Sequence, residues 1–230
     1  MVSSRELPNQ EGDLFAGQKK RAEGALAAAE QNEAYQDFRG AAILFEEGGK
    51  LDNAFANYIA SSEQQKEVAT RRLFSAESNK KKGAGYVTAC LRDAAKAYDI
   101  AAHSSQDALR TLPAAQEGLD HSLRQKIRDS IAKSWHMNGD IQIKLFMQDI
   151  AIYKKLRARL QSSSIGEIGK EQLQKRKDEL LGKRQEQTSK ALIAFYNARE
   201  FCDDPEKRAL LEERIKKYEE RQNKGFNTPA

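Results

Sequence analysis

The feature that most constrains the fold of this chain is the rarity of residues that interrupt a helix. Its 230 residues include four prolines, which leave residues 9–112 and 114–204 free of the one residue that reliably breaks helices. Alanine occurs 32 times, whereas valine occurs three times and threonine five times. Alanine favours helices, and β-branched residues favour strands. We therefore predict an all-α fold.

The clearest local signal is a helical hairpin in residues 38–61. An apolar helical pattern ends at Gly48 and Gly49, and a second pattern begins directly after them. Small Ala42 and Ala54 stand among large aromatic residues. This arrangement lets two helix backbones approach while bulky side chains fill the space beside them. Since hairpins of this kind usually occur in stacks, we predict stacked antiparallel helical hairpins that bind other proteins.

Turn signals divide the rest of the chain. Further helix–turn–helix units are predicted to start near residues 72 and 122, and a new helix is predicted after His103. Gly139, between an asparagine and an aspartate, predicts a helix end followed by a new cap. The predicted organisation is a tail over 1–12, a hairpin-repeat domain over 13–160, a linker over 161–169, a charged helical pair over 170–222 and a tail over 223–230.

Composition and charge limit the surroundings of the protein. There are 39 basic and 34 acidic side chains, a net charge of +5, which favours mild attraction to acidic surfaces. The sequence has neither an apolar run of about 18 residues nor a secretory signal. Cys90 and Cys202 lie far apart, which is typical of a reducing compartment, so we expect a cytoplasmic location. Basic residues are not interleaved with aromatic ones, which argues against a nucleic-acid partner.

No pattern for catalysis is present, so we expect no enzyme activity, cofactor or small-molecule substrate. His103, His121 and His136 lie in separate segments without the spacing of metal ligands, so no metal site is expected either. Neither cysteine has a neighbouring histidine or a C-x-x-C context. The glycine-rich loops that bind phosphate groups are absent from the sequence.

Clusters of basic residues are the remaining feature. Those near helix ends, such as residues 80–82, offset the helix dipole and need no ligand, so one interpretation is a plain solvated surface. Alternatively, clusters that share one face of a stacked scaffold can hold an acidic helical or extended segment of a partner protein. The candidate partner-binding residues on this second interpretation are Tyr58, Lys81, Arg92, Lys155 and Arg159.

The first hairpin resembles a tetratricopeptide repeat, in which large, small and aromatic residues alternate around a glycine turn. The matching residues are Phe38, Ala42, Phe45, Gly49, Leu51, Ala54 and Tyr58. Residues 89–99 and 150–153 are similar to helices of the soluble attachment proteins that work on SNARE complexes. This resemblance implies a tetratricopeptide-like scaffold and an adaptor in vesicle or membrane traffic. The chain ends without that family's leucine-containing acidic tail, so stimulation of a partner ATPase is not expected.

Residues 204–221 resemble the last helix of MIT domains, which bind short helical tails in membrane remodelling. This second resemblance implies an alternative function, an MIT-like or coiled-coil membrane-remodelling component that uses the C-terminal helices and contacts a membrane peripherally. Against it, the predicted helix over 170–201 shows no break where an MIT domain needs one. The adaptor is therefore the favoured hypothesis.

Overall fold

The computed structural model describes residues 23–33, 36–112, 121–161 and 166–223. All regular structure in these ranges is helical, which confirms the predicted all-α class. The helices are a segment over 23–33, α2 (Phe38–Glu47), α3 (Leu51–Ser78), the 3-10 turn η1 (Lys80–Lys82), α4 (Ala84–Thr111), α5 (His121–Leu160), α6 (Glu167–Phe201) and α7 (Pro205–Asn223). The predicted tails over 1–12 and 223–230 lie outside the described residues, except for Asn223, which ends α7.

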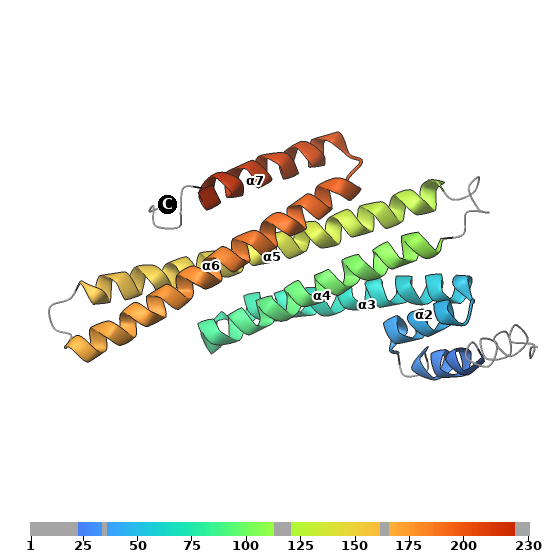
Figure 1. Ribbon diagram of the computed structural model, residues 1–230, viewed down its shortest axis with the longest axis horizontal. Helices are drawn as coiled ribbons and strands as arrows, with labels where there is room; N and C mark the ends of the chain where they lie inside the picture. Colours follow the sequence, from blue (N-terminus) through green and yellow to red (C-terminus); the bar gives the residue numbers. More distant parts are fainter. Residues whose placement is uncertain (1–22, 34–35, 113–120, 162–165, 224–230) are drawn as a thin grey trace, which may run out of the picture.

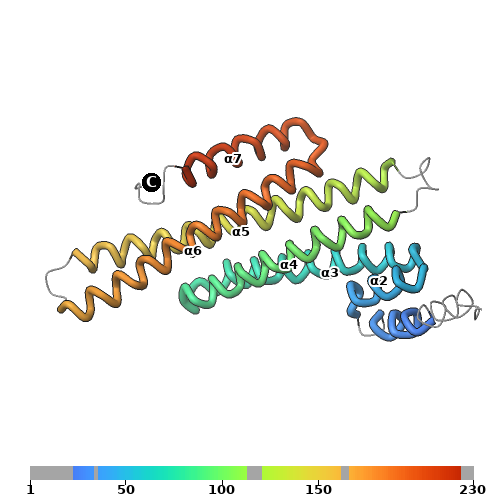
Figure 2. The backbone as a smooth tube through the Cα atoms, in the orientation of Figure 1, coloured from blue at the N-terminus to red at the C-terminus, as the bar shows by residue number. Residues whose placement is uncertain are grey.

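Two long antiparallel helix pairs form the body of the molecule (Figure 1). The first pair is α3 with α4 and the second is α5 with α6, and α4 packs on α5 to join them. The shorter α2 packs against α3 at one end of the molecule, while α7 turns back along α6 (Figure 2). The predicted arrangement of antiparallel hairpins is therefore present, as elongated rods.

The predicted turn of the first hairpin is confirmed. The residues between α2 and α3 include Gly49, whose φ of +73° lies in the left-handed region that glycine tolerates best. Ala42 and Ala54 are fully buried, as expected for the small residues between two close helices. The carboxylate of Asp37 caps α2 by accepting a hydrogen bond of 3.1 Å from the backbone N–H of Gly40.

Two predicted helix ends are wrong. α4 continues through His103, and α5 continues through Gly139. A Cβ atom on Gly139 would lie 2.5 Å from Cε1 of Phe195 in α6, so glycine is needed here for close packing of two helices. The neighbouring Asn138 donates a hydrogen bond of 3.2 Å from Nδ2 to the carbonyl oxygen of Ala95 in α4. The residues that predicted a turn instead join α5 to both of its neighbours.

The predicted spacing of the hairpins is also wrong in part. Residue 72, where a second unit was expected to begin, lies within α3, because α3 and α4 are each 28 residues long. The unit expected near residue 122 does begin with α5, but its returning helix is α6. Of the predicted linker over 161–169, residues 162–165 lie outside the described residues, and residues 167–169 already form the start of α6.

The division into domains over 13–160 and 170–222 stays a prediction. One core cluster nevertheless contains residues from both sides of the linker. Its members include Ala102 of α4, Ile131 and Trp135 of α5, Phe195 of α6 and Tyr218 of α7. The four C-terminal helices therefore share buried apolar contacts and hold the surface between them in a fixed arrangement.

Candidate ligand-binding groove

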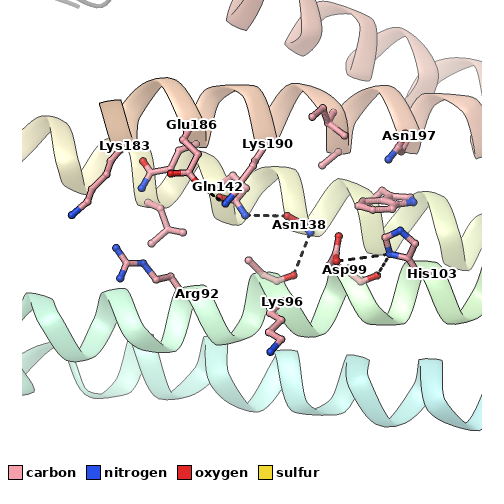
Figure 3. Close-up of a pocket in the computed structure, with 16 residues that line it drawn as sticks. Arg92, Lys96, Asp99, His103, Asn138, Gln142, Lys183, Glu186, Lys190 and Asn197 are labelled. Carbon is pink, nitrogen blue, oxygen red and sulfur yellow. Dashed lines mark hydrogen bonds and ion pairs between the residues drawn. The ribbon is translucent and has the colours of Figure 1, made fainter. Parts of the chain in front are cut away.

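An open groove of about 730 Å³ lies between α4, α5 and α6 (Figure 3). Each helix contributes side chains three or four residues apart, because these positions share one helix face. On α4 they include Arg92, Lys96, Asp99 and His103, and on α6 they include Lys183, Glu186, Lys190 and Asn197. The α5 residues Trp135, Asn138, Gln142 and Leu145 lie between these two rows.

The groove combines an apolar floor with a basic rim. Trp135, Leu145 and Ala194 are buried, whereas Ile193 is 59% exposed and presents an apolar side chain. The rim residues Arg92, Lys96, Lys183 and Lys190 are all exposed. Four cationic side chains against two carboxylates leave the lining with two positive charges when His103 is neutral.

The positive charge is concentrated toward one end of the groove. Figure 3 shows Lys183, Glu186 and Arg92 together there, while Asp99, His103 and Asn197 lie at the other end. Glu186 accepts a hydrogen bond of 2.6 Å from Lys190. This bond, strengthened by the positive charges of Lys190, Arg92 and Lys183, holds the pKa of the Glu186 carboxyl below its usual value. A carboxylate is therefore already favoured at the basic end.

Most of the cationic side chains of the groove form no ion pair with the described residues. Within the described part of the chain, Arg92, Lys96 and Lys183 have no ion-pair partner, whereas Lys190 pairs with Glu186. Exposed cations without a partner attract anionic groups of a ligand. The groove can thus receive acidic side chains above an apolar surface.

Two buried polar atoms belonging to groove residues lack a hydrogen-bond partner among the described residues. They are Nε1 of Trp135, a donor, and Oε1 of Gln187, an acceptor. The side-chain nitrogen of Gln187 donates to Oδ2 of Asp149 at 2.9 Å, which fixes the amide orientation and leaves its oxygen unpaired. The indole of Trp135 meets the His103 ring edge-on, with ring centroids 5.1 Å apart.

The structure separates the five residues predicted from the sequence to contact a partner. Arg92 lines the groove. Lys81 in η1, and Lys155 and Arg159 near the end of α5, are exposed but do not line it. Tyr58 is 2% exposed and its hydroxyl donates to Glu46 at 2.9 Å. The prediction of Tyr58 as a surface contact is wrong, because its ring fills the core between the first helices.

Sequence reasoning missed Lys96, Lys183, Lys190 and Trp135. A signal for them exists, since Arg92, Lys96 and His103 follow one face of a helix, as do Lys183 and Lys190. The pairing of these two faces could not be read from the chain, because it depends on α4 and α6 packing against the same side of an unbroken α5.

Comparison of the chain with protein-family models, with curated proteins and with solved structures finds no match. Within the described ranges, no helix combines the length and apolar character needed to cross a membrane. The same residues contain no group of three or more histidine, cysteine, aspartate or glutamate side chains that could hold a metal ion. The groove is therefore the feature from which a function can be inferred.

Proposed function

We propose that this chain is a non-catalytic binding protein that holds an acidic segment of another protein in the groove between α4, α5 and α6. The proposal rests on three exposed cations that have no ion-pair partner among the described residues, Arg92, Lys96 and Lys183, above a floor that includes Trp135 and Leu145. An acidic segment with apolar side chains complements both parts of this surface.

The dimensions of the groove suit a short segment. The α4 residues that line it run from Arg92 to His103, a distance of about 16 Å at 1.5 Å per residue. The volume of about 730 Å³ falls within the range of about 300–1,000 Å³ that is common for ligand sites. A single chain segment fills such a groove, whereas a folded domain contacts only its rim.

The rim and the floor contribute differently to binding. An exposed ion pair stabilises a complex by about 0–1 kcal/mol, so the cations mainly speed association and select acidic partners. Affinity comes mainly from apolar groups that cover the exposed Ile193 and reach the floor at Trp135. Binding should therefore weaken with added salt without being abolished.

The broader role as an adaptor in vesicle or membrane traffic, in the cytoplasm, is part of the same proposal. It is supported by the helical-hairpin architecture and by the resemblance of residues 89–99 and 150–153 to helices of the soluble attachment proteins. This broader role requires no contacts in the groove beyond those described above.

A charge-reversal pair tests the proposal. Linear peptides of about seven residues are selected from a display library on the wild-type protein and titrated by fluorescence polarisation. An extended residue is about 3.3 Å long, so such peptides span the whole groove. The double variant K183E/K190E should raise the Kd at least about tenfold, a loss of about 1.4 kcal/mol of binding free energy. The matched control K154E/K155E carries the same charge change on exposed residues of α5 outside the groove and should leave the Kd within about twofold.

Two results would contradict the proposal. The first is a set of selected peptides without acidic residues, or no selected peptides at all. The second is an equal effect of both variants, or a larger effect of K154E/K155E, which would move the site to the surface around Lys155 and Arg159. Circular dichroism of each variant should match the wild type, since all four lysines are exposed.

A further inference from the structure

We infer that the groove binds its ligand as an extended chain, whose main chain pairs with Trp135 and Gln187 and whose acidic side chain takes the place of Glu186 among the cations. This inference rests on the proposed function and adds the conformation and direction of the ligand. It follows from the two unpaired polar atoms and from the uneven distribution of charge along the groove.

Two side chains that line the groove are buried and carry a polar atom without a hydrogen-bond partner among the described residues. Trp135 is 5% exposed and Gln187 is 8% exposed, so both side chains are more than nine-tenths buried. Buried polar groups are nearly always hydrogen-bonded, and leaving one unpaired costs about 1–3 kcal/mol. The donor at Trp135 and the acceptor at Gln187 belong to residues that line one groove, so a ligand seated there can supply the missing partners once the side chains that cover these atoms move aside.

The kind of partner needed favours an extended peptide. In an α-helix the backbone N–H and C=O groups bond to one another, except near the ends. An extended chain presents both groups along its whole length. Such a chain can accept from the indole N–H of Trp135 and donate to the side-chain oxygen of Gln187. A helix lying in the groove could do so only with its side chains.

The length of the groove also suits an extended chain. His103, whose ring meets that of Trp135, lies at one end of the groove, and Glu186 lies toward the other. The α5 residues of the groove run from Trp135 to Leu145, about 15 Å of helix. An extended chain covers this distance with about five residues, at about 3.3 Å each.

The charge distribution gives the ligand a direction. Lys190 is hydrogen-bonded to the carboxylate of Glu186, and the positive charges of Arg92 and Lys183 also favour this carboxylate without pairing with it. A carboxylate on the ligand would meet the same three positive charges once Glu186 turns toward solvent. The acidic side chain of the ligand is thus expected beside Gln187, and the uncharged part of its chain beside Trp135.

Access to the indole requires a movement of His103. Its ring covers Trp135 edge-on, but the side chain is 48% exposed and is held by a hydrogen bond to the backbone oxygen of Asp99. An exposed ring can rotate aside without opening the core. The single tryptophan of the chain then reports directly on groove occupancy.

The experiment uses the full chain labelled with ¹⁵N and two displayed libraries of equal acid content. One library presents linear peptides of about seven residues, and the other presents the same number of variable positions on a stable helix. The linear library should give the tighter groove ligands, and their binding should move the one indole N–H resonance downfield, as hydrogen-bond formation does. E186Q should lower the Kd about two- to fivefold, because it removes a carboxylate that competes with the acidic side chain of the ligand. The matched control E179Q, on an exposed α6 residue outside the groove, should leave the Kd unchanged.

The outcomes separate this inference from the proposed function. Helical ligands that bind more tightly than the linear ones and are lost in K183E/K190E would overturn the extended conformation and leave the proposed function intact. Linear ligands that bind without moving the indole resonance, or with no response to E186Q, would overturn the assigned contacts. Failure of both libraries to give a groove ligand would overturn the proposed function as well.

Discussion

Gly139 offers a test of how α5 and α6 pack. Alanine is better than glycine inside a helix by about 1 kcal/mol, so Gly139→Ala would stabilise an isolated α5. In the protein, the new Cβ would lie 2.5, 2.7 and 2.9 Å from three ring carbons of Phe195. That ring is fully buried, and its centroid lies 6.2 Å from that of Tyr218, so it cannot move away freely.

The size of the effect follows from these distances. Overpacking a core costs about 1–3 kcal/mol, and contacts this short on a fully buried ring place Gly139→Ala in the upper half of that range. After the gain in helix propensity, we expect a net loss of about 1–2 kcal/mol. Gly182→Ala is the matched control, since Gly182 lies inside α6 and no atom of the described residues comes within 4 Å of the added Cβ. It should stabilise the protein by about 1 kcal/mol.

The two variants are compared by thermal and urea unfolding, followed by circular dichroism. A gap of about 2–3 kcal/mol corresponds to melting temperatures about 4–12 °C apart in a chain of this size. The smaller Phe195→Leu side chain should recover part of the loss when it is combined with Gly139→Ala. Equal stability of the two glycine variants would refute the close approach of α5 and α6 at this point, and with it the explanation for the unbroken α5.

Two further predictions concern residues outside the groove. Burial lowers the pKa of His136 below its ordinary value, while Asp140 opposes and Arg214 reinforces this shift, so the unfolded chain binds the proton more readily. The contribution of neutral His136 to the free energy of unfolding should be fully present above about pH 6.5 and decrease as the pH falls toward the pKa of the folded state. His136→Asn should flatten this dependence of the urea midpoint, and an unchanged slope would count against it. Tyr58→Phe removes the hydrogen bond to Glu46 and should cost about 1 kcal/mol without changing peptide affinity. Spectrophotometric titration of the wild type should show a tyrosine with a pKa of about 12, raised mainly by the burial of Tyr58. If Tyr58→Phe instead weakens peptide binding at unchanged stability, Tyr58 is a contact residue after all.

The helical class and the first turn could be predicted because their signals are local. Alanine content, the scarcity of proline and the glycines at positions 48 and 49 act on the residues beside them in the sequence. Gly139 shows the limit of such reasoning. Glycine permits both a turn and a close helix contact, and only the partner ring at Phe195, which lies 56 positions further along the chain, decides between them.

The candidate site was predictable only in part for the same reason. Arg92 was among the residues predicted to contact a partner, but Lys183 and Lys190 become its neighbours only through the packing of α4 and α6 on α5. Tyr58 was misplaced because an aromatic residue on an apolar helix face fits a core and a binding surface equally well in sequence. Its burial depends on the helices around it.

The most direct test of the central claim is the reactivity of individual lysines in the wild-type protein, with and without a selected acidic peptide. Brief acetylation followed by mass spectrometry compares Lys96, Lys183 and Lys190 in the groove with Lys154 and Lys155, which are exposed outside it. The groove assignment predicts that bound peptide slows acetylation of the first three lysines and leaves the other two unchanged. Protection of Lys154 and Lys155 with full reactivity in the groove would contradict it.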